Sequence, residues 1–211
     1  MKVIAVNGSP NKDGNTAKAL GAMAEILEAE GVDAEIVNVG GELIRGCVAC
    51  GKCASSEKNL CVLGDDIVND TCLKMREADG IILGAPTYYA GIPGPMKACL
   101  DRVFFSSSRY FKYKVGTAVA VVRRTGGLDV VHQLMNFFNL AQTVTPPSQY
   151  WTVAYGMDAG EVLSDAEGMQ TLRKNARSMA WLIKMIAATK GSIPTPDETV
   201  REKRVFTNFI R

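Results

Sequence analysis

The chain has 211 residues, which fits one compact domain with a short appendage and excludes two full-length domains. Its content of 47% hydrophobic and 22% charged residues excludes an intrinsically disordered chain. The formal net charge of +2 excludes a general attraction to polyanions, so we expect no nucleic-acid partner.

The first part of the chain alternates apolar runs with amphipathic stretches. Residues 2–7 are mainly β-branched and apolar and end at a Gly-Ser-Pro turn, which predicts a buried strand. This run is too short for the hydrophobic region of a signal peptide. Apolar residues at steps of three and four predict a helix over 15–30, and alternation predicts a strand over 33–39. Residues 46–64 show no periodicity and are expected to form a loop.

The same alternation continues to residue 189. Asp65 and Asp66 are expected to open a helix that reaches about residue 78, because carboxylates complement the N–H groups at a helix start. The following elements are then expected: strand 80–85, helix 93–105, strand 115–122, helix 128–141, strand 149–153 and helix 165–189. This alternation predicts a three-layer, doubly wound α/β domain with a parallel five-stranded sheet. Ligands of such sheets bind beyond the carboxyl ends of the strands.

We assign residues 1–190 to this domain and residues 191–211 to a C-terminal arm. The arm carries basic and large apolar residues, namely Arg201, Lys203, Arg204, Phe206, Phe209 and Ile210. It has no place in the sheet, so we expect it to pack on the core or on a neighbouring subunit. No stretch reaches the length of a membrane span, and we expect a cytoplasmic protein with no membrane partner.

Cytoplasmic thiols stay reduced, so the six cysteines are expected to be ligands, redox groups or core residues. Cys72 and Cys99 fall on apolar helix faces and are expected in the core. The one histidine, His132, is expected to be a surface or packed residue and makes a Ser-His-Asp triad a poor interpretation. Phe137-Phe138 and Tyr150-Trp151 are expected to be core or interface aromatics. We assign no catalytic side chain.

The loop after the first strand carries small polar residues and runs directly into a helix. Its backbone N–H groups, the hydroxyls of Ser9 and Thr16 and the amide of Asn15 are suited to bind a phosphate. Gly8 and Gly14 are one residue too far apart for a Walker A loop, and no GxGxxG spacing for a dinucleotide is present. The loop therefore predicts a monophosphate site; an ordinary strand-to-helix turn is the alternative.

Two further loops follow the third and fourth strands. The segment Pro86-Thr87-Tyr88-Tyr89-Ala90-Gly91-Ile92-Pro93-Gly94 predicts a rigid turn whose backbone can lie close to a flat ring. The alternative is a tight turn whose tyrosines only cover a helix. Arg123-Arg124-Thr125-Gly126-Gly127 supplies a second loop of small residues with cations, which a solvated turn explains equally well.

The loop over residues 46–64 contains four cysteines with the spacing C-x2-C-x2-C-x7-C: Cys47, Cys50, Cys53 and Cys61. Three thiolates at three-residue steps can bind three irons of a cubane, and a more distant fourth can complete it. Structural zinc usually takes two separated pairs of cysteines, so this compact spacing favours a [4Fe-4S] cluster over zinc. The alternative is that the cysteines hold no cluster.

As a set, several of these segments resemble the NADPH-dependent FMN reductase and iron-sulfur flavoprotein family. The segments are Asn7-Gly8-Ser9-Pro10 with Gly14-Asn15-Thr16, Pro86-Thr87-Tyr88-Tyr89, Lys97 with Asp101-Arg102, and Arg-x-x-Gly-Gly at residues 123–127. The resemblance covers about residues 1–140. It implies a flavodoxin-like fold with strand order 2-1-3-4-5, bound FMN, and a flavin pocket completed by a neighbouring subunit.

The resemblance also implies which residues hold the cofactors. Ser9, Asn15 and Thr16 are implied for the FMN phosphate. Asn11 stands where an arginine is common in the family, and Lys12 is the candidate to replace it. The flavin ring is assigned to Pro86, Thr87, Tyr88, Tyr89 and Gly91, with Arg124, Gly126 and Gly127 completing the cofactor-binding set. Iron-sulfur flavoproteins carry a compact cysteine motif before an Asp-Asp, which Asp65-Asp66 matches here.

Three functions are consistent with these residues. The first is an FMN-dependent oxidoreductase that takes electrons from a nicotinamide or a protein donor. The second is a non-catalytic electron-transfer protein that relays electrons between a [4Fe-4S] cluster and FMN. The third is a phosphate-binding regulator without flavin. We expect a homodimer or homotetramer.

Overall fold

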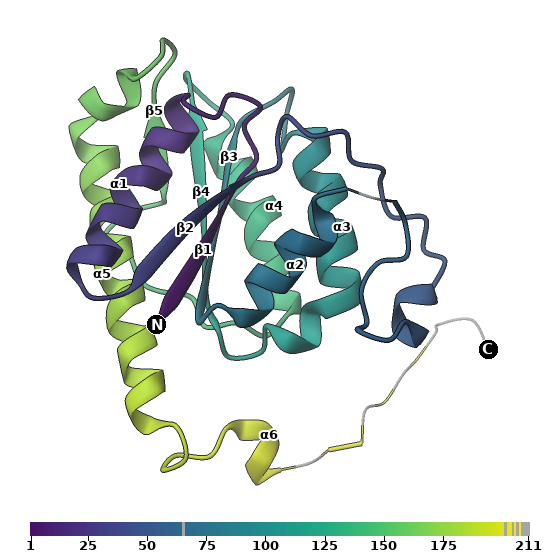
Figure 1. Ribbon diagram of the computed structural model, residues 1–211. Coiled ribbons are helices and arrows are strands. Elements are labelled where there is room, and N and C mark those ends of the chain that lie inside the picture. The colour runs from purple at the N-terminus through teal and green to yellow at the C-terminus, as the bar shows by residue number, and fades with distance from the viewer. Residues whose placement is uncertain (65, 201, 204, 206, 208–211) are drawn as a thin grey trace.

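The computed structural model, drawn in Figure 1, describes residues 1–64, 66–200, 202–203, 205 and 207. These residues form a parallel sheet of five strands with helices on both faces. The strands are β1 (Lys2–Asn7), β2 (Asp33–Asn38), β3 (Gly80–Pro86), β4 (Val115–Val122) and β5 (Val153–Tyr155). Their order across the sheet is β2-β1-β3-β4-β5. The predicted three-layer, doubly wound fold and its strand order are confirmed.

Five longer helices form the outer layers. They are α1 (Asn15–Ala29), α2 (Val68–Glu77), α3 (Gly94–Ser107), α4 (Gly127–Leu140) and α5 (Ala166–Thr189). Helices α1 and α5 cover one face of the sheet, and α2, α3 and α4 cover the other (Figure 1). The shorter helices of the described residues are η1 (Lys52–Ser55), η2 (Ser108–Tyr110), η3 (Glu161–Ser164) and α6 (Pro196–Thr199).

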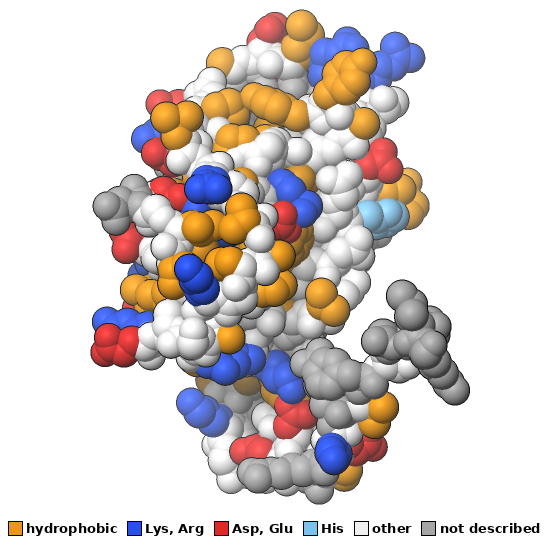
Figure 2. Space-filling view, turned by 90° about the vertical axis from the view of Figure 1, so that its right-hand side faces the viewer, with side chains coloured by type: hydrophobic (Ala, Val, Ile, Leu, Met, Phe, Trp, Pro, Cys, Tyr) orange, Lys and Arg blue, Asp and Glu red, His pale blue; other side chains and the backbone are white. Residues whose placement is uncertain are grey.

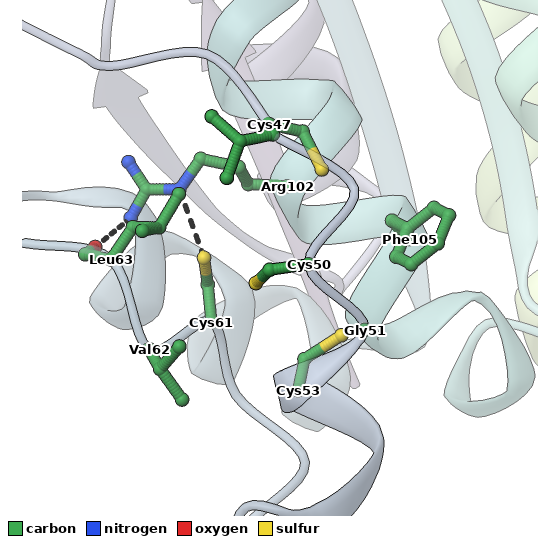
Figure 3. Close-up of a pocket in the computed structure, with 10 residues that line it drawn as sticks. Cys47, Cys50, Gly51, Cys53, Cys61, Val62, Leu63, Arg102 and Phe105 are labelled. Atoms are coloured by element: carbon green, nitrogen blue, oxygen red, sulfur yellow. Dashed lines mark hydrogen bonds between the residues drawn. The ribbon is translucent and has the colours of Figure 1, made fainter.

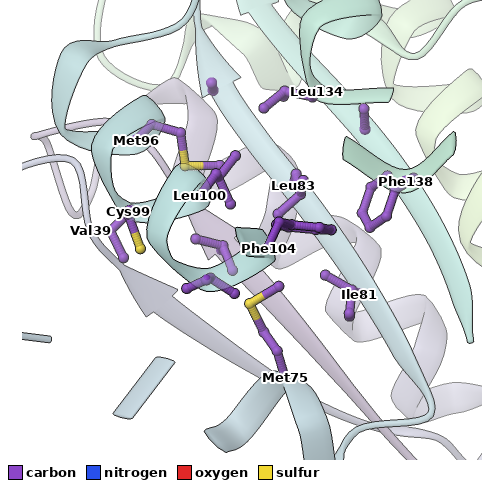
Figure 4. Packing of buried hydrophobic residues seen from close by; sticks show 14 of the residues in the cluster. Val39, Met75, Ile81, Leu83, Met96, Cys99, Leu100, Phe104, Leu134 and Phe138 are labelled. Atoms are coloured by element: carbon purple, nitrogen blue, oxygen red, sulfur yellow. The ribbon is translucent and has the colours of Figure 1, made fainter. Parts of the chain in front are cut away.

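Alternation along the central strands fills both layers. In β1, Val3 and Ala5 join the core under α1 and α5, while Ile4 and Val6 join the core under α2, α3 and α4. All eight residues of β4 are buried. Figure 4 shows the second core, in which Leu83 lies among Phe104 and Phe138 from α3 and α4. A sheet that is buried on both faces needs such apolar strands, so the positions of these strands could be predicted from the sequence.

Two predicted boundaries are wrong. Helix α2 begins at Val68 and not at the two aspartates. Asp65 lies outside the described residues, and the Asp66 carboxylate accepts the N–H of Val68 at 3.2 Å from a position before the helix. Strand β5 covers residues 153–155 instead of 149–153, because Tyr150 and Trp151 are exposed and pairing with β4 starts at Val153.

Predictions for isolated side chains can be checked as well. Cys72 and Cys99 are buried, as predicted, and burial raises the pKa of the Cys99 thiol to about 12. His132 lies exposed on α4. Phe138 is a core residue, whereas Tyr150 and Trp151 are half exposed, so they are not core aromatics.

The C-terminal arm contacts its own domain where Asp197 pairs with Lys112 at 2.5 Å. Of the arm residues singled out from the sequence, Lys203 is described. Arg201, Arg204, Phe206, Phe209 and Ile210 lie outside the described residues. In the described part of the chain, no helix combines the length and the apolar character needed to cross a membrane.

Candidate functional site

The loop between β1 and α1 is held from beneath by buried side chains. The Asn7 side chain donates to Asn38 at 2.8 Å and accepts the N–H of Ser9 at 3.0 Å. The buried Ser9 hydroxyl accepts the N–H of Asn11 at 3.2 Å. These bonds fix the loop directly beyond the carboxyl end of β1, where doubly wound sheets bind ligands.

The start of α1 is suited to an anion. Gly14 precedes the helix, no described side chain caps its first turn, and no acidic residue lies in that turn. The first N–H groups of a helix carry partial positive charge and need partners, so a phosphate fits there. Thr16 lies in this first turn and is buried. Asn11 and Lys12 are exposed beside it, and within the described residues Lys12 forms no ion pair.

Asn15 has a different environment from the one expected. Its side-chain amide donates to the carbonyl of Asp158 at 2.9 Å and accepts the N–H groups of Gly160 and Val162 at 2.9 and 3.3 Å. These bonds tie the β5–α5 connection to the start of α1. The Asn15 side chain is therefore a loop anchor, and its backbone N–H is the main group it can offer a phosphate.

The loop after β3 is a tight turn. Tyr88 and Gly91 exchange two backbone hydrogen bonds, of 2.8 and 2.6 Å, which leaves Tyr89 and Ala90 at the tip. Both tyrosines are exposed, and Ala90 has a positive φ of 73°. Gln133 of α4 accepts the N–H of Ile92 at 3.2 Å and so holds the turn from behind. Sequence reasoning missed Gln133, because nothing local links it to a loop 41 residues earlier.

The loops after β3 and β4 meet at Thr87. The Thr87 backbone donates to Val121 of β4 at 3.3 Å, and a Cβ at Gly126 would lie 2.9 Å from the Thr87 methyl group. The Thr87 hydroxyl is buried and has no hydrogen-bond partner among the described residues. An unpaired buried hydroxyl is costly, by about 1–3 kcal/mol, so such a group suits a ligand atom.

The remaining residues of the predicted cofactor set lie at the start of α4. Gly126 has a φ of 90° that favours glycine, and Gly127 begins the helix. Together with Arg124 they line a groove of about 490 Å³ between α4 and the start of α5. The aromatic side chains of Tyr150, Trp151 and Tyr155 line the same groove. Gly126 therefore faces both Thr87 and this groove, whereas Arg124 is exposed at its rim.

The carboxyl edge of the sheet thus carries a loop that leads into the uncapped start of α1 and, after β3, a tight turn. The unpaired Thr87 hydroxyl and the uncapped start of α1 are groups that a bound phosphorylated ring compound can satisfy. These residues fit FMN. Pro86 ends β3 at the base of the turn.

The four cysteines of the loop before α2 line one pocket (Figure 3). Cys47, Cys53 and Cys61 are half-buried, and Cys50 is exposed. Val48, Val62 and Phe105 complete its apolar wall and are partly exposed. Figure 2 views the molecule from this side and shows hydrophobic side chains gathered among lysines and arginines. Burial raises the pKa of the Cys53 thiol.

The chemistry of this donor set decides what it can hold. Among the described His, Cys, Asp and Glu side chains, no group of three is placed to hold a single metal ion. A cubane cluster does not require three side chains to converge on one metal ion, because each of its four thiolates binds a different iron. Four thiols around one pocket are a donor set that a [4Fe-4S] cluster would need.

The sequence is similar to that of several known proteins. Residues 1–158 match the NADPH-dependent FMN reductase family. An iron-sulfur flavoprotein of Methanocaldococcus jannaschii is 34% identical over 198 residues, which cover 88% of this chain and 99% of the relative. An iron-sulfur flavoprotein of Methanosarcina thermophila is 31% identical over 193 residues, covering 88% and 97%.

Solved structures support the fold. A flavodoxin from the domain Archaea superimposes with a TM-score of 0.59 at 16% identity, covering 87% of this chain and 99% of the flavodoxin. The fold is therefore flavodoxin-like.

Proposed function

The chain belongs to the NADPH-dependent FMN reductase family, and from this premise we propose that it is an FMN-dependent oxidoreductase that also carries a [4Fe-4S] cluster. The observation that carries the flavin proposal is the placement of two loops at one edge of the sheet. A loop that leads into the uncapped start of α1 follows β1, and a tight turn follows β3, which is the neighbouring strand. FMN has a phosphate and a flat ring, so its binding would use both the loop after β1 and the turn after β3.

The residues have separate roles in this proposal. Ser9, Thr16 and the first N–H groups of α1 would bind the phosphate, and Lys12, four residues before Thr16, would supply positive charge. The turn of residues 86–91 and Gly126 would hold the ring, and the Thr87 hydroxyl would be free to hydrogen-bond to the cofactor. When bound, FMN supplies hydride or single-electron chemistry. The protein supplies position and electrostatic environment, so no general acid is needed.

The cysteine pocket supports the second cofactor. Cys47, Cys50, Cys53 and Cys61 would each bind one iron. The relatives named iron-sulfur flavoproteins favour the same assignment. Replacing any one of the four by serine is expected to make the cluster labile and to leave FMN bound, because the phosphate loop consists of other residues.

The same pocket favours one alternative function, a relay that passes electrons between cluster and flavin without turning over a substrate. Steady-state oxidation of NADPH or NADH by the purified holoprotein separates the two. Turnover with a nicotinamide supports the reductase. Flavin that is reduced only by a protein or chemical electron donor supports the relay.

Phosphate binding is tested with alanine variants. Loss of a charge-assisted hydrogen bond costs about 1.5–3 kcal/mol, so Ser9→Ala or Thr16→Ala should weaken FMN binding about tenfold or more. Ser192→Ala is the control, because Ser192 is exposed beyond α5. Unchanged FMN affinity in both loop variants would refute this phosphate site.

A further inference from the structure

The fourth cysteine, Cys61, is separated from the others by the longest gap, yet the structure holds it most firmly. Its backbone N–H donates to the side chain of Asn69 at 3.1 Å, and its carbonyl accepts from the same side chain at 2.9 Å. Its sulfur accepts a hydrogen bond from Nε of Arg102 at 3.1 Å (Figure 3). Asn69 belongs to α2 and Arg102 to α3, so two helices fix one cysteine.

Arg102 is fully buried and uses every hydrogen on its guanidinium group. An arginine side chain has five N–H donors. Nε donates to Cys61. One terminal nitrogen donates to the Arg45 carbonyl at 3.2 Å and to Asp66, and the other donates to the Leu63 carbonyl and, at 3.1 Å, to Asp66. The five bonds join both ends of the cysteine loop to α3.

The positive charge of Arg102 is compensated by an adjacent carboxylate. Asp66 pairs with it, and the side chain of Asp66 is 14% exposed while that of Arg102 is 0% exposed. A buried guanidinium is stable only when it is paired and its donors are satisfied, and both conditions hold here. Lysine has three donors and no planar fork, so it cannot reproduce this arrangement.

A second arginine provides a natural comparison. Arg76 of α2 donates to the carbonyls of Lys58 and Asn59, both at 2.7 Å, and packs over the ring of Tyr110. It therefore also ties the cysteine loop to the domain. It differs in that these hydrogen bonds of its guanidinium group go to oxygen atoms and not to sulfur.

We propose that Arg102 is the positioning residue of the cysteine site: it fixes Cys61 as the fourth ligand and, through its N–H···S hydrogen bond, raises the reduction potential of the cluster. This inference rests on the proposed cluster. Hydrogen bonds to ligand sulfurs and nearby charge are two of the factors that set iron-sulfur potentials. Both favour the reduced cluster, which carries one more negative charge, so removing the hydrogen bond lowers the potential.

The test compares wild type, Arg102→Lys and Arg76→Lys, each purified without oxygen. Lysine keeps the positive charge in both variants, so the comparison isolates the hydrogen-bond fork. Three quantities are measured: iron and sulfide per chain, the rate of iron loss to a chelator, and the cluster midpoint potential followed by electron paramagnetic resonance. The resonance signal of the reduced cluster separates it from the flavin.

Arg102→Lys is expected to lose iron about tenfold faster than wild type, in line with the effect of outer partners of metal ligands. Its cluster potential is expected to be more negative. Arg76→Lys is expected to keep the wild-type potential. If wild type carries iron but Arg102→Lys shows the same iron-loss rate and potential as Arg76→Lys, the proposed role of Arg102 is overturned and the proposed cluster still stands. Wild type without iron would refute the proposed cluster and this inference together.

One outcome needs a further measurement, namely Arg102→Lys protein that binds no iron. Hydrogen–deuterium exchange of iron-free proteins then decides. Protection lost only in residues 60–66 supports the positioning role. Protection lost across the central strands would show a general folding defect and overturn the proposal.

Discussion

Gly40→Ala should displace the phosphate loop, because Gly40 packs directly against its backbone. Gly40 follows β2, and a Cβ added there would lie 2.2 Å from the Gly8 carbonyl oxygen and 2.3 Å from the Ser9 carbonyl carbon. Ordinary contact begins at 3.4 Å, so the two segments must separate by about 1.2 Å. The colliding atoms belong to backbone, which cannot rotate away as a side chain can.

The size of the effect follows from that displacement. A shift of about 1 Å lengthens an N–H···O bond from its usual value of about 2.9 Å beyond useful range. Losing one charge-assisted bond to phosphate costs about 1.5–3 kcal/mol, which corresponds to a roughly 10- to 100-fold weaker affinity for FMN. Overpacking should also lower the free energy of unfolding by about 1–3 kcal/mol.

The assay is titration of apoprotein with FMN, followed by quenching of flavin fluorescence, together with urea unfolding of the same samples. Gly41→Ala is the matched control, since its added Cβ would meet Pro10 at an ordinary distance of 3.4 Å. Gly40→Ala that is folded and binds FMN as tightly as Gly41→Ala would refute the argument that this contact positions the phosphate loop.

Three other predictions concern stability and assembly. Asp66→Ala leaves the buried Arg102 unpaired and should lower the free energy of unfolding by about 3–5 kcal/mol, which corresponds to a fall in Tm of roughly 10 °C. A fall in Tm of less than about 2 °C would contradict a stabilising role of this buried ion pair. The Cys99 thiol has a pKa near 12 when folded and an ordinary value of 9.0, so above about pH 9 the unfolded chain releases a proton that the folded chain keeps. The free energy of unfolding should therefore fall as pH rises above about 9, and Cys99→Ala should flatten that fall in urea titrations; identical pH profiles would be inconsistent with this. Finally, Tyr150 and Trp151 are 61% and 51% exposed beside the edge strand β5, so we expect this surface to be covered in a homodimer or larger assembly. Light scattering of the FMN-bound protein at micromolar concentration measures the mass, and the mass of one chain would contradict this prediction.

The sheet and its helices could be predicted because their signals are local. Central strands buried on both faces read as apolar runs, and β4 was placed correctly at both ends. Strand β5 was misplaced because it has three residues at the sheet edge, and the aromatic residues before it face solvent. The strand propensity of the aromatic residues predicted a strand there, but these residues do not pair with β4 in the folded sheet.

The positions of the candidate loops could be predicted from the sequence, whereas the contacts of their individual side chains could not. The glycines and hydroxyls of the loop after β1 lie within nine residues of one another, so a shared role could be proposed from the sequence. Asn15 was assigned to phosphate, but its side chain holds a segment 143–147 residues away. Arg102 was noted only as part of a family motif. Its partners, from Arg45 to Asp66, lie 36–57 residues earlier in the chain, and only folding brings them to it.

The central claim, that one chain holds both FMN and a [4Fe-4S] cluster, is tested most directly by the visible spectrum of protein purified without oxygen, with FMN, iron and acid-labile sulfide counted on the same sample. We expect flavin bands over a broad charge-transfer absorption, with one FMN, four irons and four sulfides per chain. Protein expressed with ample iron that carries FMN but neither iron nor sulfide would contradict the cluster. Protein that binds no FMN would contradict the flavin site.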